Sequence, residues 1–150
     1  MSKKVQPIPE GFHTLTPYLI VADADKELEF IKSAFDGQVI HLSRAADGTI
    51  SHVTLKVGDS MLMMGQGSKI HPPAASMLYM YVEDTDAVYQ RALECGAKSE
   101  REPADQIYGD RTGGVVSATG IHWWFGTRIE EVSEEEMEKR TKAMMAKHGG

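Results

Sequence analysis

The chain has 150 residues, of which 41% are hydrophobic and 25% charged, a composition that is typical of a globular domain and excludes disordered, collagen-like and low-complexity proteins. Its 16 basic and 22 acidic residues give a net charge of -6, so we expect no nucleic-acid partner, because phosphate contacts need clustered lysine and arginine. The single cysteine, Cys95, cannot form an internal disulfide, and neither a signal-peptide pattern nor an apolar run of about 18 residues is present, so we expect a cytoplasmic protein with no membrane span.

Two stretches in different halves of the chain, residues 16–37 and 77–96, read alike. Each begins with an apolar run, continues with valine and two aspartates at alternate positions, and ends with a helical pattern that stops at glycine. Asp23 therefore matches Asp84, and we expect each aspartate to cap a helix by accepting hydrogen bonds from free backbone N–H groups. We expect the glycine at the end of each helix to supply the left-handed residue that closes it.

Apolar residues at alternate positions, interrupted by turn residues, follow each helix and predict three strands in each copy. The predicted strands are residues 38–44, 49–57 and 60–64 in the first copy and residues 97–101, 114–117 and 121–127 in the second, with turns at 108–111 and 119–120. The predicted fold class is therefore α+β, with two βαβββ modules in one domain that spans residues 1–150. The modules cover about residues 12–66 and 76–128, and a linker rich in glycine and proline joins them at about residues 65–75.

A further helix is predicted at about residues 133–147. Ser133 followed by Glu136 forms a capping box, acidic residues fill the first turn, and basic residues follow toward the end. The apolar stripe of this helix consists of Met137, Thr141, Met144 and Met145. We interpret the stripe as a packing seam and not as a cofactor site, because methionine commonly fills apolar contacts.

Five segments stand in a distinctive order along the chain. They are TPYLIVADADKELEFIKSAF at residues 16–35, SHVTLKVGDSMLMMGQ at 51–66, YVEDTDAV at 81–88, DQIYGDRTGGV at 105–115 and GTRIEEVSEEEMEKR at 126–140. In this order the segments resemble the vicinal oxygen chelate superfamily, the glyoxalase, bleomycin-resistance and dioxygenase group, and within it the PhnB-like branch. The resemblance covers nearly all of residues 12–140. It implies two modules whose strands curl into a half-barrel around a cleft that is often completed across a homodimer.

Metal-using members of this family, the resemblance implies, hold one divalent ion on four ligands, one from the first and one from the last strand of each module. The matching positions in this chain are Thr16, Met63, Met77 and Trp124. Sites for such ions need imidazole, carboxylate or thiolate ligands, and none of the four residues supplies one. We therefore expect no metal, and we expect no other cofactor because no phosphate-binding glycine loop is present.

Two histidines are candidates for contacting a ligand or moving a proton. His52 stands beside Val53, which is expected to face the helices, so His52 is expected on the opposite, cleft-lining face. His122 is expected there as well, because in a regular strand it shares a face with Trp124. An ordinary exposed or hydrogen-bonded histidine is the alternative at both positions. A metal site built from His13, His52 and His122 is a further alternative.

Aromatic and methionine side chains dominate the expected cleft face. They are Tyr18, Met63, Met77, Tyr79, Tyr81 and Trp124. Such a surface stacks on flat or apolar ligands while phenol groups orient them, and ordinary core filling is the alternative. Trp123 should face the opposite side of its strand from Trp124 and be buried against a helix.

The predicted turn at residues 108–111 adds Tyr108 and Arg111, which the resemblance places at the mouth of the cleft. Arg111 is expected either to bind an acidic group of the ligand or to form a salt bridge with Asp105 or Asp110 that holds the turn. The complete set of candidate ligand-binding residues is Thr16, Tyr18, His52, Met63, Met77, Tyr79, Tyr81, Tyr108, Arg111, His122 and Trp124.

The leading hypothesis for function is a binding protein that takes a small aromatic or apolar molecule into its cleft without a metal. A metal-dependent isomerase, lyase or dioxygenase of the same family is one alternative, and an interaction module whose cleft is filled by side chains is another. The sequence leaves open whether the protein is an enzyme. We also expect a homodimer, because half-barrel sheets leave edges and methionine-rich surface that a partner can cover.

Overall fold

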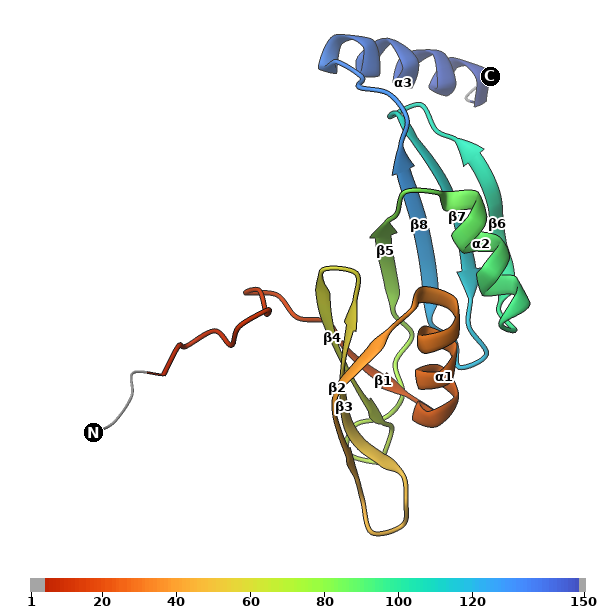
Figure 1. Ribbon diagram of the computed structural model, residues 1–150. Coiled ribbons are helices and arrows are strands. Elements are labelled where there is room, and N and C mark those ends of the chain that lie inside the picture. Colours follow the sequence, from red (N-terminus) through yellow and green to blue (C-terminus); the bar gives the residue numbers. More distant parts are fainter. Residues whose placement is uncertain (1–4, 149–150) are drawn as a thin grey trace. The chain divides into compact units, whose positions relative to one another are not determined.

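Each half of the internal repeat forms a curled four-stranded sheet with one helix, and a third helix follows at the C-terminal end (Figure 1). The computed structural model describes residues 5–148. The chain divides into two units: unit one runs to Ser76 and includes Ser117–Ile121, and unit two comprises Met77–Val116 and the chain from His122 onward. The predicted α+β class and the two βαβββ modules are confirmed.

Unit one contains β1 (Tyr18–Val21), α1 (Ala24–Phe35), β2 (Gln38–Arg44), β3 (Ile50–Val57) and β4 (Ser60–Gln66), and its sheet has the strand order β1-β4-β3-β2. Unit two contains β5 (Met77–Tyr81), α2 (Thr85–Glu94), β6 (Lys98–Asp105), β7 (Asp110–Val116) and β8 (His122–Arg128), with the order β5-β8-β7-β6. The first strand of each unit lies parallel to the last one, while the other pairs are antiparallel. The second parallel strand is reached through a helix and two further strands, since a tight hairpin joins antiparallel strands only.

The aspartate caps of the two helices are confirmed. The side chains of Asp23 and Asp84 each accept a hydrogen bond from a backbone N–H three residues ahead, at 3.1 Å in both cases. The expected glycine closure is found after α2, where Gly96 has a φ of +103°, but it is wrong for α1, where Asp36 takes the left-handed conformation. Gly37 is required there for a different reason, because a Cβ at this position would lie 2.8 Å from the side chain of Ile31.

One face of each sheet packs on the helix of its own unit and forms a core. In unit one the buried side chains of β1, β3 and β4 include Leu19, Val21, Val53, Leu55, Leu62 and Met64. In unit two, Trp123 and Phe125 of β8 lie with Ala92 of α2 among the buried residues, and Trp123 is only 2% exposed. The alternation of side chains along each strand therefore leaves the other face of each sheet open.

The hairpin of β6 and β7 is longer than predicted. β6 extends to Asp105 and β7 begins at Asp110, so part of the predicted turn at residues 108–111 belongs to a strand. β6 contains Pro103 and β7 contains Gly113 and Gly114, residue types that are uncommon inside strands. The structure accommodates them because β6 is an edge strand and its register shifts on both sides of Arg101.

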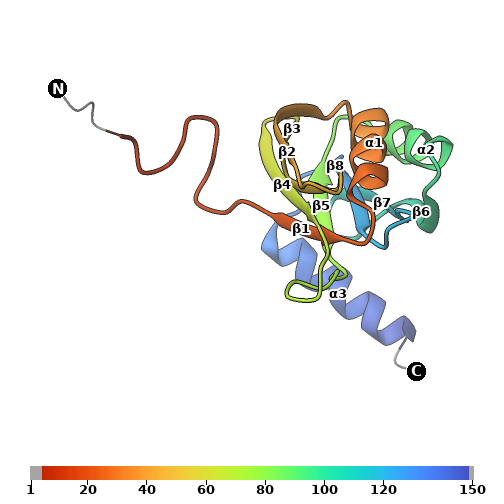
Figure 2. The ribbon, with the colours of Figure 1, turned by 90° about the horizontal axis from the view of Figure 1, so that it is seen from below.

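Helix α3 (Glu134–His148) confirms the predicted C-terminal helix, and its capping serine, Ser133, accepts a hydrogen bond from the backbone of Glu136. Figure 1 shows α3 beyond the ends of β7 and β8, and Figure 2 shows its C-terminal half extending clear of the strands of unit two. None of the helices described between residues 5 and 148 is both long and apolar enough to span a membrane.

Candidate functional site

The open face of the unit-two sheet gathers aromatic side chains. Met77, Tyr79 and Tyr81 alternate along β5, and the register places Met77 beside His122 and Tyr79 beside Trp124 of β8. These five residues form what we call the aromatic face. Tyr79 is 40% exposed and Tyr81 is 66% exposed, and Trp124 and His122 are half-buried. The expected opposite facing of the two tryptophans is confirmed, since Trp123 is in the core.

Two of these rings lie directly over glycines of the neighbouring strand. A Cβ on Gly114 would lie 2.6 Å from the indole of Trp124, and a Cβ on Gly126 would lie 2.6 Å from Cζ of Tyr79. Any larger residue would lift the ring from the sheet, because contacts this short do not occur between real side chains. The two glycines thus let the rings of Trp124 and Tyr79 lie close against the sheet, and we call these two rings the floor of the aromatic face.

Asp110 lies beneath the two tyrosines, and its side chain is buried, with the residue 2% exposed. The hydroxyl of Tyr81 donates a hydrogen bond to its Oδ2 at 2.9 Å, and that of Tyr79 donates to the same atom at 3.2 Å. Burial, followed by the Asp110 charge and hydrogen bond, raises the pKa of Tyr79 well above its ordinary value, and the hydrogen bond to Asp110 raises the pKa of Tyr81. Both phenols are therefore held protonated and oriented.

Replacing Asp110 with asparagine is expected to lower the pKa values of Tyr79 and Tyr81, because the negative charge that disfavours a phenolate is removed. In the wild-type protein a raised pKa contributes stability that is present below the ordinary value of 10.0 and is lost as the pH rises through the folded-state value. Alkaline titration of phenolate absorbance measures the two pKa values, Tyr79→Phe identifies the component due to Tyr79, and urea denaturation at several pH values measures the change in stability. Identical titration curves for the wild type and the Asp110→Asn variant would show that the carboxylate does not control these phenols.

Glu100 organises the other end of the aromatic face. Its Oε1 accepts a hydrogen bond from Nδ1 of His122 and its Oε2 accepts one from Nε1 of Trp124, each at 2.8 Å. The guanidinium of Arg101 stacks over the Trp124 ring, 4.6 Å from the ring centroid, and donates a hydrogen bond to the hydroxyl of Thr112. The register shift at this point of β6 lets the consecutive residues Glu100 and Arg101 reach the same face.

The hydrogen bond from Nδ1 to Glu100 determines which nitrogen of the neutral His122 ring carries the proton. Because a carboxylate only accepts, Nδ1 carries the proton, and in the neutral ring Nε2 is an acceptor. Within residues 5–148, no hydrogen bond is found to this Nε2. His122 thus presents an oriented nitrogen that can accept a proton or hydrogen bond from a molecule on the aromatic face.

The open face of unit one repeats part of this arrangement. Tyr18, which matches Tyr79 in the repeat, lies over Gly65, where a Cβ would be 3.0 Å from its hydroxyl. The hydroxyl of Tyr18 lies 3.3 Å from Nδ1 of His52, and Nε2 of His52 lies 2.9 Å from the hydroxyl of Thr54. Both ring nitrogens of His52 therefore have hydrogen-bond partners within unit one.

The four positions that match metal ligands in the family carry side chains that do not fit a metal. Thr16 lies before β1 and its hydroxyl donates to the carbonyl of His13 at 3.4 Å, while Met63, Met77 and Trp124 lie on the open faces of their sheets. Within the described range, no group of three or more His, Cys, Asp or Glu side chains is arranged to hold a metal ion.

Arg111 lies on the side of the unit-two sheet that faces α2, and not at the aromatic face. Its guanidinium binds Asp86 at 2.6 Å and 2.9 Å and Asp105 at 2.9 Å, and these bonds raise the pKa of Arg111 above its already high ordinary value. The structure thus contains the predicted salt bridge to Asp105 and adds one to Asp86. Tyr108 is exposed and lines a groove beside α3.

Several residues of the site could not be identified from the sequence pattern. Glu100, Arg101 and Asp110 were assigned to a strand end or a turn, and Gly114 was read as the start of a strand. One feature of the sequence does point to the site: Gly126 matches Gly65 in the repeat. Gly126 lies under Tyr79, as Gly65 lies under Tyr18. The register shift in β6 leaves no trace in the alternation of apolar residues.

Comparison with known proteins agrees with this architecture. The family model described as "Glyoxalase/Bleomycin resistance protein/Dioxygenase superfamily" matches residues 11–125, and the chain belongs to this superfamily. An uncharacterised protein of Mycobacterium bovis is 31% identical over 135 residues, which cover 83% of this chain and 89% of that protein.

Two solved structures illustrate the likeness in fold. The crystal structure of TioX from Micromonospora sp. ML1 has a TM-score of 0.66 at 21% identity and covers 78% of this chain and 99% of the other. A Bacillus cereus protein described as "Putative 3-demethylubiquinone-9 3-methyltransferase, PhnB protein" has a TM-score of 0.61 at 19% identity, with 77% and 99% covered. At these identities the two structures show the shared fold.

Proposed function

We propose that the protein binds a small, flat aromatic molecule on the aromatic face of unit two, without a metal, and sequesters it. The observation that carries the proposal is the fixed floor of rings, in which Trp124 lies on Gly114 and is tied to Glu100, and Tyr79 lies on Gly126. Fixed aromatic rings that are partly exposed favour stacking with a flat ligand, since little side-chain freedom is lost on binding, and at Trp124 the ligand stacks beside the Arg101 guanidinium, which covers part of the outer face of the indole.

Arg101 indicates that the ligand carries a negatively charged group. It lies over the Trp124 ring, and as a guanidinium it carries five N–H donors, one of which is used by Thr112. An aromatic ring that lies on the floor with a carboxylate or similar group at its edge can accept a hydrogen bond from Arg101. Arg101 thus takes the role of acid-binding cation that the sequence suggested for Arg111.

A matched pair of probes tests this proposal. Calorimetric titration with 4-nitrobenzoate is expected to give saturable binding, and Arg101→Gln is expected to weaken it by about tenfold, the size of one charge-assisted hydrogen bond. The neutral probe 4-nitrobenzyl alcohol is expected to bind the wild type and the Arg101→Gln variant with equal affinity. Failure of both probes to bind at millimolar concentration, or equal weakening of both, would contradict the proposal.

A second candidate is a metal-independent enzyme in which His122 acts as a general base. The observation that favours it is the hydrogen bond from Nδ1 of His122 to the Glu100 carboxylate, because this bond leaves Nε2 of the neutral ring as the acceptor. With 4-nitrophenol as the probe, the O–H proton would move to Nε2 and leave a bound phenolate, so its absorption band is expected to grow in the wild type and not in His122→Gln. Absence of the band in both proteins would leave binding as the proposed function and remove this second candidate.

Three finer assignments are part of the proposal. The PhnB-like branch is supported by the five sequence segments in their order, and the cytoplasmic location by the single cysteine, Cys95. The metal-dependent alternative is less favoured, because Thr16, Met63, Met77 and Trp124 offer no suitable ligand set. The open aromatic face likewise disfavours a cleft that is filled by side chains.

A further inference from the structure

The open face of unit one carries a row of four side chains that corresponds, in the repeat, to a row across the aromatic face. The register of the strands β1, β4, β3 and β2 places side by side Tyr18, Met63, Thr54 and His41. The corresponding row across unit two is Tyr79, Trp124, Gly114 and Arg101. Where unit two has an indole and a guanidinium, unit one therefore has a thioether and an imidazole.

A register shift in β2 brings His41 to this face. Val39 pairs with Leu55 and His41 pairs with Thr54, so β2 contains one extra residue between them. The same shift occurs before Arg101 in β6, where the guanidinium lies over the Trp124 ring. Bulges of this kind are frequent where a strand aims a side chain at a binding site. His41 occupies the position that corresponds to Arg101, so it stands within reach of Met63.

His52 is the second imidazole on this face, and its ring centroid lies 6.2 Å from that of His41. The two histidines are diagonal neighbours on antiparallel strands, because His41 pairs with Thr54 and Ser43 pairs with His52. Nε2 of His52 lies 2.9 Å from the hydroxyl of Thr54, which is only 5% exposed. This nitrogen therefore lies close above the middle of the row.

A hydroxyl group holds one nitrogen of each ring. The Tyr18 hydroxyl lies 3.3 Å from Nδ1 of His52, and the Ser43 hydroxyl lies 2.9 Å from Nε2 of His41. Within residues 5–148, no hydrogen bond is found to Nδ1 of His41. When the held nitrogen carries the proton, the other nitrogen of a neutral ring is an acceptor, and this is how most histidines that bind metals are oriented.

Two imidazoles and a thioether are neutral donors that together suit a soft cation. Met63 does not suit the divalent ions of the family, but thioethers select monovalent copper, and imidazole binds copper as well. Lys56 stands two residues after Thr54 on the same side of β3, and its charge opposes a divalent ion more strongly than a monovalent one. The donor set therefore favours Cu⁺.

The spacing of the two rings allows them to share one ion. A metal–nitrogen bond of about 2.0 Å places an imidazole centroid about 3 Å from the ion, so two rings on one ion have centroids at most about 6 Å apart. The observed 6.2 Å lies at this limit. Rotation about the side-chain bonds therefore brings both rings onto one ion while the strands stay in place.

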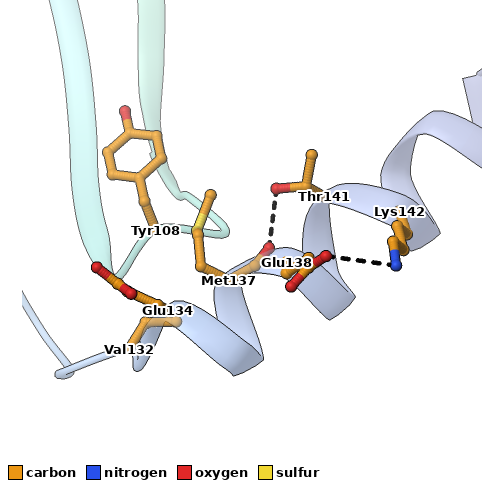
Figure 3. Close-up of a pocket in the computed structure, with 7 residues that line it drawn as sticks. All are labelled: Tyr108, Val132, Glu134, Met137, Glu138, Thr141 and Lys142. Atoms are coloured by element: carbon orange, nitrogen blue, oxygen red, sulfur yellow. Dashed lines mark hydrogen bonds and ion pairs between the residues drawn. The ribbon is translucent and has the colours of Figure 1, made fainter.

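We propose that unit one binds one Cu⁺ ion above Thr54, through Nδ1 of His41, Nε2 of His52 and the sulfur of Met63. The ion takes the place of the hydrogen bond between His52 and Thr54, while Tyr18 and Ser43 keep the other ring nitrogens in position. The aromatic face and the groove beside α3 (Figure 3) belong to unit two, so the copper site is separate from both.

Anaerobic competition with bicinchoninic acid, whose Cu⁺ complex is coloured, measures the affinity. The wild type is expected to withdraw about one Cu⁺ per chain from the chelator. His41→Gln and His52→Gln are each expected to lower the affinity at least about tenfold, because loss of even a supporting hydrogen bond at a metal site costs about 10- to 100-fold. Met63→Leu, which keeps the volume and removes the sulfur, is expected to have an effect of the same size.

Three control variants are expected to keep the wild-type affinity for Cu⁺. Met64→Leu makes the same change one residue further along β4, where the side chain is buried in the core of unit one. His71→Gln removes an exposed histidine of the linker, and Cys95→Ser removes the free thiol. Far-ultraviolet circular dichroism checks that each variant is folded. A wild type that withdraws no copper, full affinity in Met63→Leu, or loss of binding in Cys95→Ser would overturn the inference.

Nuclear magnetic resonance with Ag⁺, a soft and diamagnetic ion, identifies the ligands in the unmodified chain. Saturable shifts are expected for the imidazole signals of His41 and His52 and for the methyl signal of Met63, while the signals of His71 stay in place. Shifts confined to other residues would contradict the proposed site, even if the chain withdraws copper from the chelator.

Discussion

Replacing Trp123 with alanine is expected to lower the free energy of unfolding by about 3 to 5 kcal/mol, the usual cost of removing a large buried aromatic side chain. Trp123 is 2% exposed and lies in the core of unit two, while its neighbour Trp124 lies on the other face of β8. Urea denaturation, followed by far-ultraviolet circular dichroism, measures the loss. The Trp123→Ala variant is expected to unfold at markedly lower urea concentration with little change in slope.

Trp124→Ala is the matched control, because the same change is made one residue further along the same strand. It is expected to unfold near the wild-type midpoint, since the ring is partly exposed, but to weaken binding of 4-nitrobenzoate by about 1 to 3 kcal/mol through the lost stacking. If Trp124→Ala unfolds the protein while Trp123→Ala leaves it stable, the assignment of the two faces of β8 is wrong.

Replacing Gly114 with alanine is expected to weaken binding of 4-nitrobenzoate by about 1 to 3 kcal/mol, the usual range for forcing an extra carbon into a packed site. The new Cβ would lie 2.6 Å from the indole of Trp124, so the ring must lift from the sheet. Lifting it breaks the alignment of Nε1 with Glu100 and the stacking of Arg101. Calorimetric titration measures the effect.

A double-mutant cycle isolates this cause. In a Trp124→Ala background there is no ring to displace, so adding Gly114→Ala is expected to change the affinity by much less than it does in the wild type. Additive effects of the two substitutions would mean that Gly114 acts on binding by a route other than the Trp124 ring.

The repeat and its local signals were sufficient to predict most of the fold. Asp23 and Asp84 cap helices because the side chain and the backbone N–H groups that it binds are a few residues apart, so the interaction is local. Trp123 and Trp124 could be assigned to opposite faces because side chains alternate along a strand. The bounds of β2, residues 38–44, coincide with the prediction.

The site was harder to predict because its key interactions join distant parts of the chain. Glu100 meets Trp124 through a register shift in β6, which the alternation of residues does not reveal. Placing residue 110 in a turn hid the fact that Asp110 and Arg111 are neighbours on a strand and must face opposite ways. Asp110 consequently lies under the tyrosines, and Arg111 faces α2.

Fluorescence of Trp124 during titration with 4-nitrobenzoate tests the proposed metal-free aromatic site most directly. The chain has two tryptophans, so Trp123→Phe leaves Trp124 as the single indole. Saturable quenching with one probe bound per chain, unchanged by excess EDTA, is the expected result. No saturable quenching at millimolar probe, or quenching that disappears in EDTA and returns on addition of Zn²⁺ or Mn²⁺, would contradict it.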